Sequence, residues 1–114
     1  MIALNEAAFL FAVGQLVRHQ RYDYRGVIVD RDDHCLAPEI WYRSNRTLPP
    51  REAPWYHILV DDPAGAVTYA AESSLALDHD RTAIHHPLVD QFFTGRDEAG
   101  GYLRNDTTWI GWPG

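Results

Sequence analysis

The chain has 114 residues, of which 46% are hydrophobic and 12% aromatic, and this is enough for one packed domain and excludes a disordered chain. The net charge is −6 and no lysine is present, so the strongly basic surface of a typical nucleic-acid-binding protein is absent overall. The charge is uneven, because residues 14–51 hold seven Arg and five acids, whereas residues 52–114 hold three Arg and ten acids. Only the first half can therefore offer a locally basic face.

No apolar run approaches the roughly 20 residues that cross a bilayer, so no membrane partner is expected. The apolar start of the chain lacks a basic region and carries Glu6, so we interpret residues 1–12 as a lead-in segment and not as a signal peptide. Cys35 is the single cysteine, which excludes an internal disulfide. These features predict a cytoplasmic protein.

Two strands are predicted next, over residues 14–19 and 24–30, with a tight connection between them. Each has β-branched residues flanked by polar ones. Gly26 lies inside the second pattern, and a glycine there indicates a bulge or a sharp bend of the kind that small barrels need at their corners.

Residues 30–54 form a long aromatic and proline-containing loop with little periodicity. A long loop inside a compact domain is usually functional or disordered. We expect an ordered excursion held by Trp41 and Tyr42, with a short helix near residues 39–43.

A β-hairpin is predicted over residues 55–71, because two alternating strands flank the turn residues 61–65. Side chains alternate along a strand, so Trp55 and Tyr56 are expected on opposite faces. From this alternation we expect one of the two to be core and the other to be available at the surface. A single helical turn is expected at residues 72–75.

The remaining chain gives weaker signals. Residues 86–93 suit either a short helix or a terminal strand, and residues 96–114 are rich in Gly, Asp and Asn and are expected to be poorly ordered. The predicted fold is mainly β: a small SH3-like barrel over residues 13–95, with the long loop and one or two short helical turns.

No catalytic, cofactor-binding or metal-binding residues are predicted. The His34–Cys35 and His85–His86 pairs lack the spacing of zinc ligands, and the acids at 30, 32 and 33 lack the glycine and final glutamate of an EF-hand loop. Cys35 with His57 or His34 as a base has no recognisable local signature. An enzyme is therefore the least favoured class.

Aromatic and arginine residues carry the functional prediction, because they are the enriched anchors of protein interfaces and also stack on bases and contact phosphates. They concentrate in the predicted barrel and its excursion. The candidate partner-binding or DNA-binding residues are Tyr22, Tyr24, Arg25, Trp41, Tyr42, Arg43, Arg46, Trp55, Tyr56 and His57.

Five stretches carry a family resemblance: VGQLVRH at 13–19, YRGVIVD at 24–30, WYRSNR at 41–46, PWYHILVD at 54–61 and TYAAE at 68–72. In combination they resemble the YccV-like family, also described as the hemimethylated-DNA-binding domain family, which includes the heat shock protein HspQ. The resemblance implies an SH3-like barrel, a non-enzymatic role and self-association into a small oligomer. It also implies two activities, binding of hemimethylated DNA and specificity enhancement for the ATP-dependent protease Lon.

Both activities stay open from the sequence. A protein-binding adaptor in protein quality control fits the net negative charge and the aromatic set. A regulator that binds hemimethylated DNA needs a basic face, on which six arginines would have to converge: Arg18, Arg21, Arg25, Arg43, Arg46 and Arg51.

Overall fold

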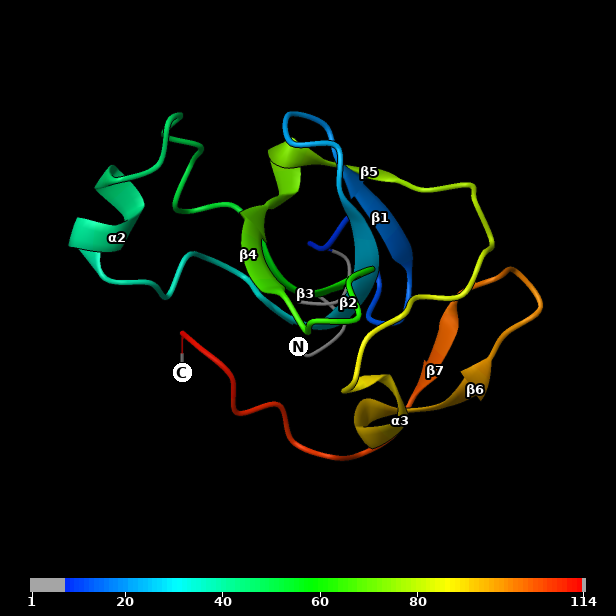
Figure 1. The fold of residues 1–114 in the computed structure, drawn as a ribbon. Helices are drawn as coiled ribbons and strands as arrows, with labels where there is room; N and C mark the ends of the chain where they lie inside the picture. Colours follow the sequence, from blue (N-terminus) through cyan, green and yellow to red (C-terminus); the bar gives the residue numbers. More distant parts are fainter. Residues whose placement is uncertain (1–7, 114) are drawn as a thin grey trace.

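A computed structural model describes residues 8–113, and its main unit is a five-stranded antiparallel sheet with the order β4-β3-β2-β1-β5 (Figure 1). The strands are β1 (Leu16–His19), β2 (Arg25–Asp32), β3 (Trp55–Val60), β4 (Val67–Ala71) and β5 (Leu75–Leu77). The sheet curls so that the short helix η1 (Glu72–Ser74) leads directly from one edge strand to the other. No ladder joins β4 to β5 among the described residues, so the roll remains open there. The prediction of a small, mainly β fold is confirmed.

The register of β2 differs in one detail from the sequence expectation. The ladder between β2 and β3 shifts between Ile28 and Asp30, so the irregularity lies after Gly26 and not at it. Gly26 is required for another reason: a Cβ there would lie 2.5 Å from the Leu59 carbonyl oxygen. The glycine lets β2 approach β3 closely.

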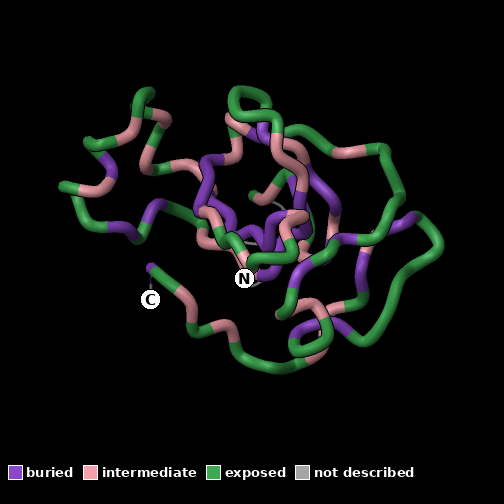
Figure 2. The backbone as a smooth tube through the Cα atoms, viewed as in Figure 1, coloured by how far each residue is buried: buried purple, intermediate pink, exposed green. Residues whose placement is uncertain are grey.

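Strand β3 is buried along its whole length, and this corrects the expectation that one of Trp55 and Tyr56 would be at the surface. Trp55 is 2% and Tyr56 0% exposed. Tyr56 belongs to the cluster inside the roll with Ile58 and Phe11, whereas Trp55 packs in a second cluster beneath the excursion. Both faces of β3 are covered, because the excursion packs over the outer one at Trp55 and the C-terminal third packs over it at Leu59. The backbone at the centre of the roll is accordingly buried (Figure 2).

The excursion between β2 and β3 is ordered, as expected, and contains the short helix α2 (Glu39–Arg43). Its return path is fixed by two hydrogen bonds to proline carbonyls: the Tyr42 hydroxyl donates to Pro49 over 2.7 Å, and the Trp55 indole donates to Pro50 over 3.0 Å. Cys35 is buried within it. The aromatic side chains therefore hold a segment that has little regular structure.

The C-terminal third adds a small helix and a second sheet. Helix α3 (Val89–Phe92) leads into β6 (Phe93–Arg96), which pairs with β7 (Tyr102–Arg104), so residues 86–93 contain the helical alternative and the start of a strand. The segment for which the sequence indicated little order includes β7, and there Tyr102 is buried and its backbone N–H donates to the Gly14 carbonyl over 2.8 Å. No helix among residues 8–113 is long and apolar enough to cross a membrane.

Candidate functional site

A groove of about 870 Å³ lies beside β4 and is walled mainly by aromatic side chains. Four segments that are distant in sequence form it: the turn between β1 and β2, the excursion, β4 with η1, and the C-terminal stretch around residues 109–112. Its aromatic lining consists of Tyr22, Tyr24, Trp41, Trp55, Tyr69, Trp109 and Trp112.

Trp41 is the centre of the aromatic wall. Its ring centroid lies 4.9 Å from that of Trp112, 5.9 Å from that of Tyr69 and 6.0 Å from that of Trp55, with edge-on or tilted geometries that aromatic pairs prefer. Trp55 and Tyr69 are buried, whereas Trp112 is 50% exposed. The groove therefore has a fixed floor and an accessible rim.

A hydrogen-bonded triad holds Tyr69 in place. One Asp32 carboxylate oxygen accepts from the Tyr69 hydroxyl over 2.7 Å and lies 2.9 Å from Nε2 of His57. Burial pushes the pKa of Asp32 upward, but these hydrogen bonds outweigh it and leave the pKa below its usual value. Burial, together with the nearby Asp32 carboxylate, raises the pKa of Tyr69, so its hydroxyl remains a donor. Because this donor is directed at the carboxylate, the triad fixes the ring as a wall.

Basic residues, and no acids, accompany the aromatic lining. Arg21 and Arg46 line the groove, and neither makes an ion pair with any residue in the described part of the chain. His19 also lines it, and its Nδ1 accepts the backbone N–H groups of Arg21 and Tyr22. Burial and the nearby Arg21 charge lower the pKa of His19, so this ring is neutral at neutral pH. Among residues 8–113, no carboxylate lines the groove, although the whole chain has 16 acids.

The edge of β4 borders the groove with unpaired backbone groups. Val60 donates to the Ala66 carbonyl and Glu72 donates to that of Pro54, and these two bonds fix the alternation of the ladder between β3 and β4. The N–H and C=O groups of Val67, Tyr69 and Ala71 therefore point away from β3. The Ala71 carbonyl is used by η1, because the N-cap carbonyl accepts the first hydrogen bond of the helix. For the other outward groups, no partner is found within residues 8–113.

Comparison with known proteins shows which family this chain belongs to. Residues 9–100 match the family described as hemimethylated DNA-binding protein YccV-like. The chain belongs to the YccV-like family. The same domain occurs in larger proteins: F-box only protein 21 from Homo sapiens and from Pongo abelii are each 32% identical over 87 residues, as is that from Mus musculus. The match covers 74% of this chain but only 14% of each relative.

Membership of the YccV-like family supports a binding module and not an enzyme. No group of three or more His, Cys, Asp or Glu side chains that could hold a metal ion is found among the residues that the structure describes. Cys35 is buried, and His57 is engaged with Asp32. The geometry therefore offers recognition by shape, stacking and charge.

In the structure, half of the ten candidate partner-binding or DNA-binding residues line the groove and half do not. Those that line the groove are Tyr22, Tyr24, Trp41, Arg46 and Trp55. Those that do not line it are Arg25, Tyr42, Arg43, Tyr56 and His57. Tyr42, Tyr56 and His57 are buried supports, and Arg43 forms an i,i+4 pair with Glu39 on α2.

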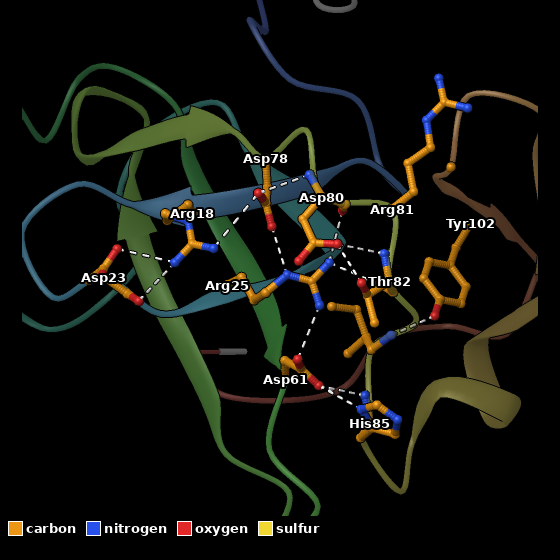
Figure 3. A network of polar contacts seen from close by, with 12 residues as sticks. Arg18, Asp23, Arg25, Asp61, Asp78, Asp80, Arg81, Thr82, His85 and Tyr102 are labelled. Atoms are coloured by element: carbon orange, nitrogen blue, oxygen red, sulfur yellow. Dashed lines mark hydrogen bonds and ion pairs between the residues drawn. The ribbon is translucent and has the colours of Figure 1, made fainter.

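Arg25 lies in a different environment, a network of polar contacts outside the groove lining (Figure 3). Its guanidinium pairs with Asp78 over 2.7 Å and with Asp61 over 3.0 Å, and it also donates to the carbonyls of Asp80 and Thr82. The Arg25 side chain is only 11% exposed. It therefore ties the segment after β5 to the sheet.

Among the aromatic and basic residues of the groove, five are absent from the candidate set: His19, Arg21, Tyr69, Trp109 and Trp112. Tyr69 alternates into the same face as Trp55, which a register across the predicted hairpin could have indicated. Nothing local in the sequence places Trp112 beside Trp41, because 71 residues separate them.

Proposed function

We propose that this domain is an adaptor or specificity factor for an ATP-dependent, Lon-type protease in protein quality control, acting in the cytoplasm, and that its groove binds a polypeptide segment of a partner. The aromatic groove carries the proposal. Its volume lies within the roughly 300–1,000 Å³ of typical ligand sites. Tyr, Trp and Arg, which make up nine of its 21 lining residues, are the residue types that anchor protein interfaces.

Binding of hemimethylated DNA is the second candidate, and the family description supports it. Of the six arginines that a basic face would need, four are engaged elsewhere. Arg18 and Arg25 pair with aspartates, whereas Arg43 and Arg51 pair with Glu39. Duplex binding depends on neutralising several phosphates with basic side chains, so two open arginines favour a protein partner over a duplex.

Degradation of an unfolded substrate by a purified Lon-type protease tests the adaptor role. The substrate is β-casein, and the rate is measured with and without this chain. We expect stimulation that is lost in Trp112→Ala, because this variant removes the exposed rim of the groove. Leu103→Ala is the control, since Leu103 is a similarly exposed apolar residue on β7, outside the groove lining. Equal stimulation by wild type and Trp112→Ala, or none by either, would overturn the proposal.

Fluorescence anisotropy with a labelled 20-base-pair duplex tests the second candidate. Hemimethylated and unmethylated duplexes are compared at low and at physiological salt. We expect weak binding with no methylation preference. Tight binding that prefers the hemimethylated duplex and requires Arg21 and Arg46 would establish the DNA-binding role instead.

A further inference from the structure

The groove runs alongside the open edge of β4, so this strand defines the direction of a chain bound in it. The open backbone groups are the N–H groups of Val67, Tyr69 and Ala71 and the C=O groups of Val67 and Tyr69, so they repeat at every second residue, the period of a strand. Successive β4 residues from 67 to 71 all line the groove, so the groove runs along this edge. An extended chain in the groove would therefore lie parallel or antiparallel to β4, within reach of its unpaired backbone.

Natural sheets usually protect such an edge, because an exposed row of donors and acceptors pairs with other chains. Lysine, proline and short length are common protections. Strand β4 contains neither residue type. Val67 on it is 41% exposed, whereas Tyr69, Ala70 and Ala71 are buried and line the groove. The opposite edge strand, β5, has only three residues. The edge of β4 is thus the more favourable one for strand addition.

The positive charge of the groove lining favours an acidic ligand. Arg21 and Arg46 are left without carboxylate partners among the described residues, whereas Arg18, Arg25 and Arg43 all have them. A ligand that carries carboxylates at strand spacing could pair with both open arginines. A basic ligand would find no counter-charge in the lining.

From these observations we infer that the groove binds an extended acidic peptide segment as an additional strand on β4, with its carboxylates directed to Arg21 and Arg46 and its apolar side chains against the aromatic wall. This inference rests on the proposed function, because it specifies how the partner segment is bound. Strand addition of this kind obtains affinity from backbone hydrogen bonds and specificity from alternate side chains.

Two blocked heptapeptides probe the charge requirement: TVEVEVT, with alternating valine and glutamate, and its lysine counterpart TVKVKVT. Neither contains an aromatic residue, so the tryptophan fluorescence of the protein reports binding directly. We expect the glutamate peptide to bind at least tenfold more tightly than the lysine peptide, with an affinity that falls as salt rises. Equal affinities would overturn the inference.

Backbone N-methylation of the glutamate peptide tests strand addition itself. One isomer is methylated on the first two valines and the other on the two glutamates, so both carry two methyl groups. An added strand presents the N–H groups of only one set to β4. We expect one isomer to lose at least tenfold in affinity while the other stays within about threefold of the parent peptide. Equal loss in both isomers, or no loss in either, would overturn strand addition.

Protein variants complete the test. Val67→Pro removes one outward N–H without removing a bond to β3, and Val67→Ala is the matched control that keeps this N–H. Arg46→Gln removes an open charge, and Arg43→Gln removes a paired charge from the same excursion. We expect Val67→Pro and Arg46→Gln each to weaken glutamate-peptide binding about tenfold. Val67→Ala should weaken it by less than about threefold, because it trims a side chain of the lining but keeps the N–H, and Arg43→Gln should leave it unchanged. The N-methylated peptides decide the question if Val67→Pro perturbs folding.

The outcomes separate this inference from the proposed function. If the glutamate peptide binds and Trp112→Ala abolishes binding, but neither methylated isomer is impaired, strand addition is wrong and a peptide-binding groove stands. If neither peptide binds while a single-stranded oligonucleotide does, or if the chain self-associates in sedimentation and Val67→Pro prevents it, an acidic peptide is the wrong occupant. If no peptide binds and protease turnover is unchanged, both proposals fail.

Discussion

Two regions of this molecule use arginine in opposite ways. On one side of the roll, Arg25 is nearly buried and bound by two aspartates and two carbonyl groups (Figure 3). On the other side, beside β4, Arg21 and Arg46 lie in an aromatic groove without ion pairs among the described residues. The first arrangement connects segments of the fold, and the second leaves charge available. The difference shows that the surroundings of an arginine, and not its presence, distinguish a structural residue from a binding residue.

Arg25→Met should give the largest effect on stability. Removing one partner from a buried ion pair leaves carboxylates without compensation, and this typically costs about 3–5 kcal/mol of unfolding free energy. Asp78, one of the two aspartates, is 7% exposed. Urea denaturation measures the change. If Arg25→Met is as stable as wild type, Arg25 is not structural and the contrast between the two regions is wrong.

Tyr102→Phe should give the next largest effect, in the same polar region. The Tyr102 hydroxyl accepts the backbone N–H of Ile84 over 2.8 Å, and both residues are buried. Leaving that N–H unsatisfied should cost about 1–3 kcal/mol. Tyr22→Phe is the control, because Tyr22 is 56% exposed and its change should stay within about 0.5 kcal/mol. Equal denaturation midpoints for the two variants would show that the C-terminal segment does not secure the loop after β5.

Arg46→Gln should separate binding from stability. Arg46 is exposed and makes no ion pair in the described part of the chain, so its replacement should change unfolding free energy by less than about 0.5 kcal/mol. Its peptide binding should nevertheless fall, which is the reverse of the Arg25→Met result. Parallel urea denaturation and peptide titration of the two variants measure both quantities. A marked loss of stability in Arg46→Gln would assign this residue to the fold.

The smallest expected effect is a pH dependence of the unfolding free energy that comes from His19 in the groove. The pKa of His19 is lowered below its ordinary value of 6.5 by burial and by Arg21, so the unfolded chain takes up the proton first as pH falls. Stability from this residue is therefore complete above pH 6.5 and declines as pH falls below that value. His19→Asn keeps an acceptor near the Arg21 N–H but does not titrate. We expect wild type to lose more unfolding free energy than His19→Asn between pH 7.5 and 5.5, and identical pH profiles would contradict this.

The local pattern of the sequence determined strands β1 to β4, the hairpin over residues 55–71, the short helix at 39–43 and the aromatic composition of the site. The strands and the hairpin follow from alternation and turn residues, which act between near neighbours. Strands β5 and β7 were not predicted from this pattern. The buried state of both Trp55 and Tyr56 did not follow, because alternation defines two faces but does not state whether another segment covers each one.

Only the tertiary structure decided which candidate residues meet in a site. It brought Trp112 beside Trp41 and left the edge of β4 unpaired along the groove. It also gave carboxylate partners to Arg25 and Arg43 but none in the described chain to Arg46, although the three look alike in sequence. The physical reason is that ion pairing, burial and the exposure of a sheet edge depend on contacts between distant segments, and those contacts exist only after the chain has folded.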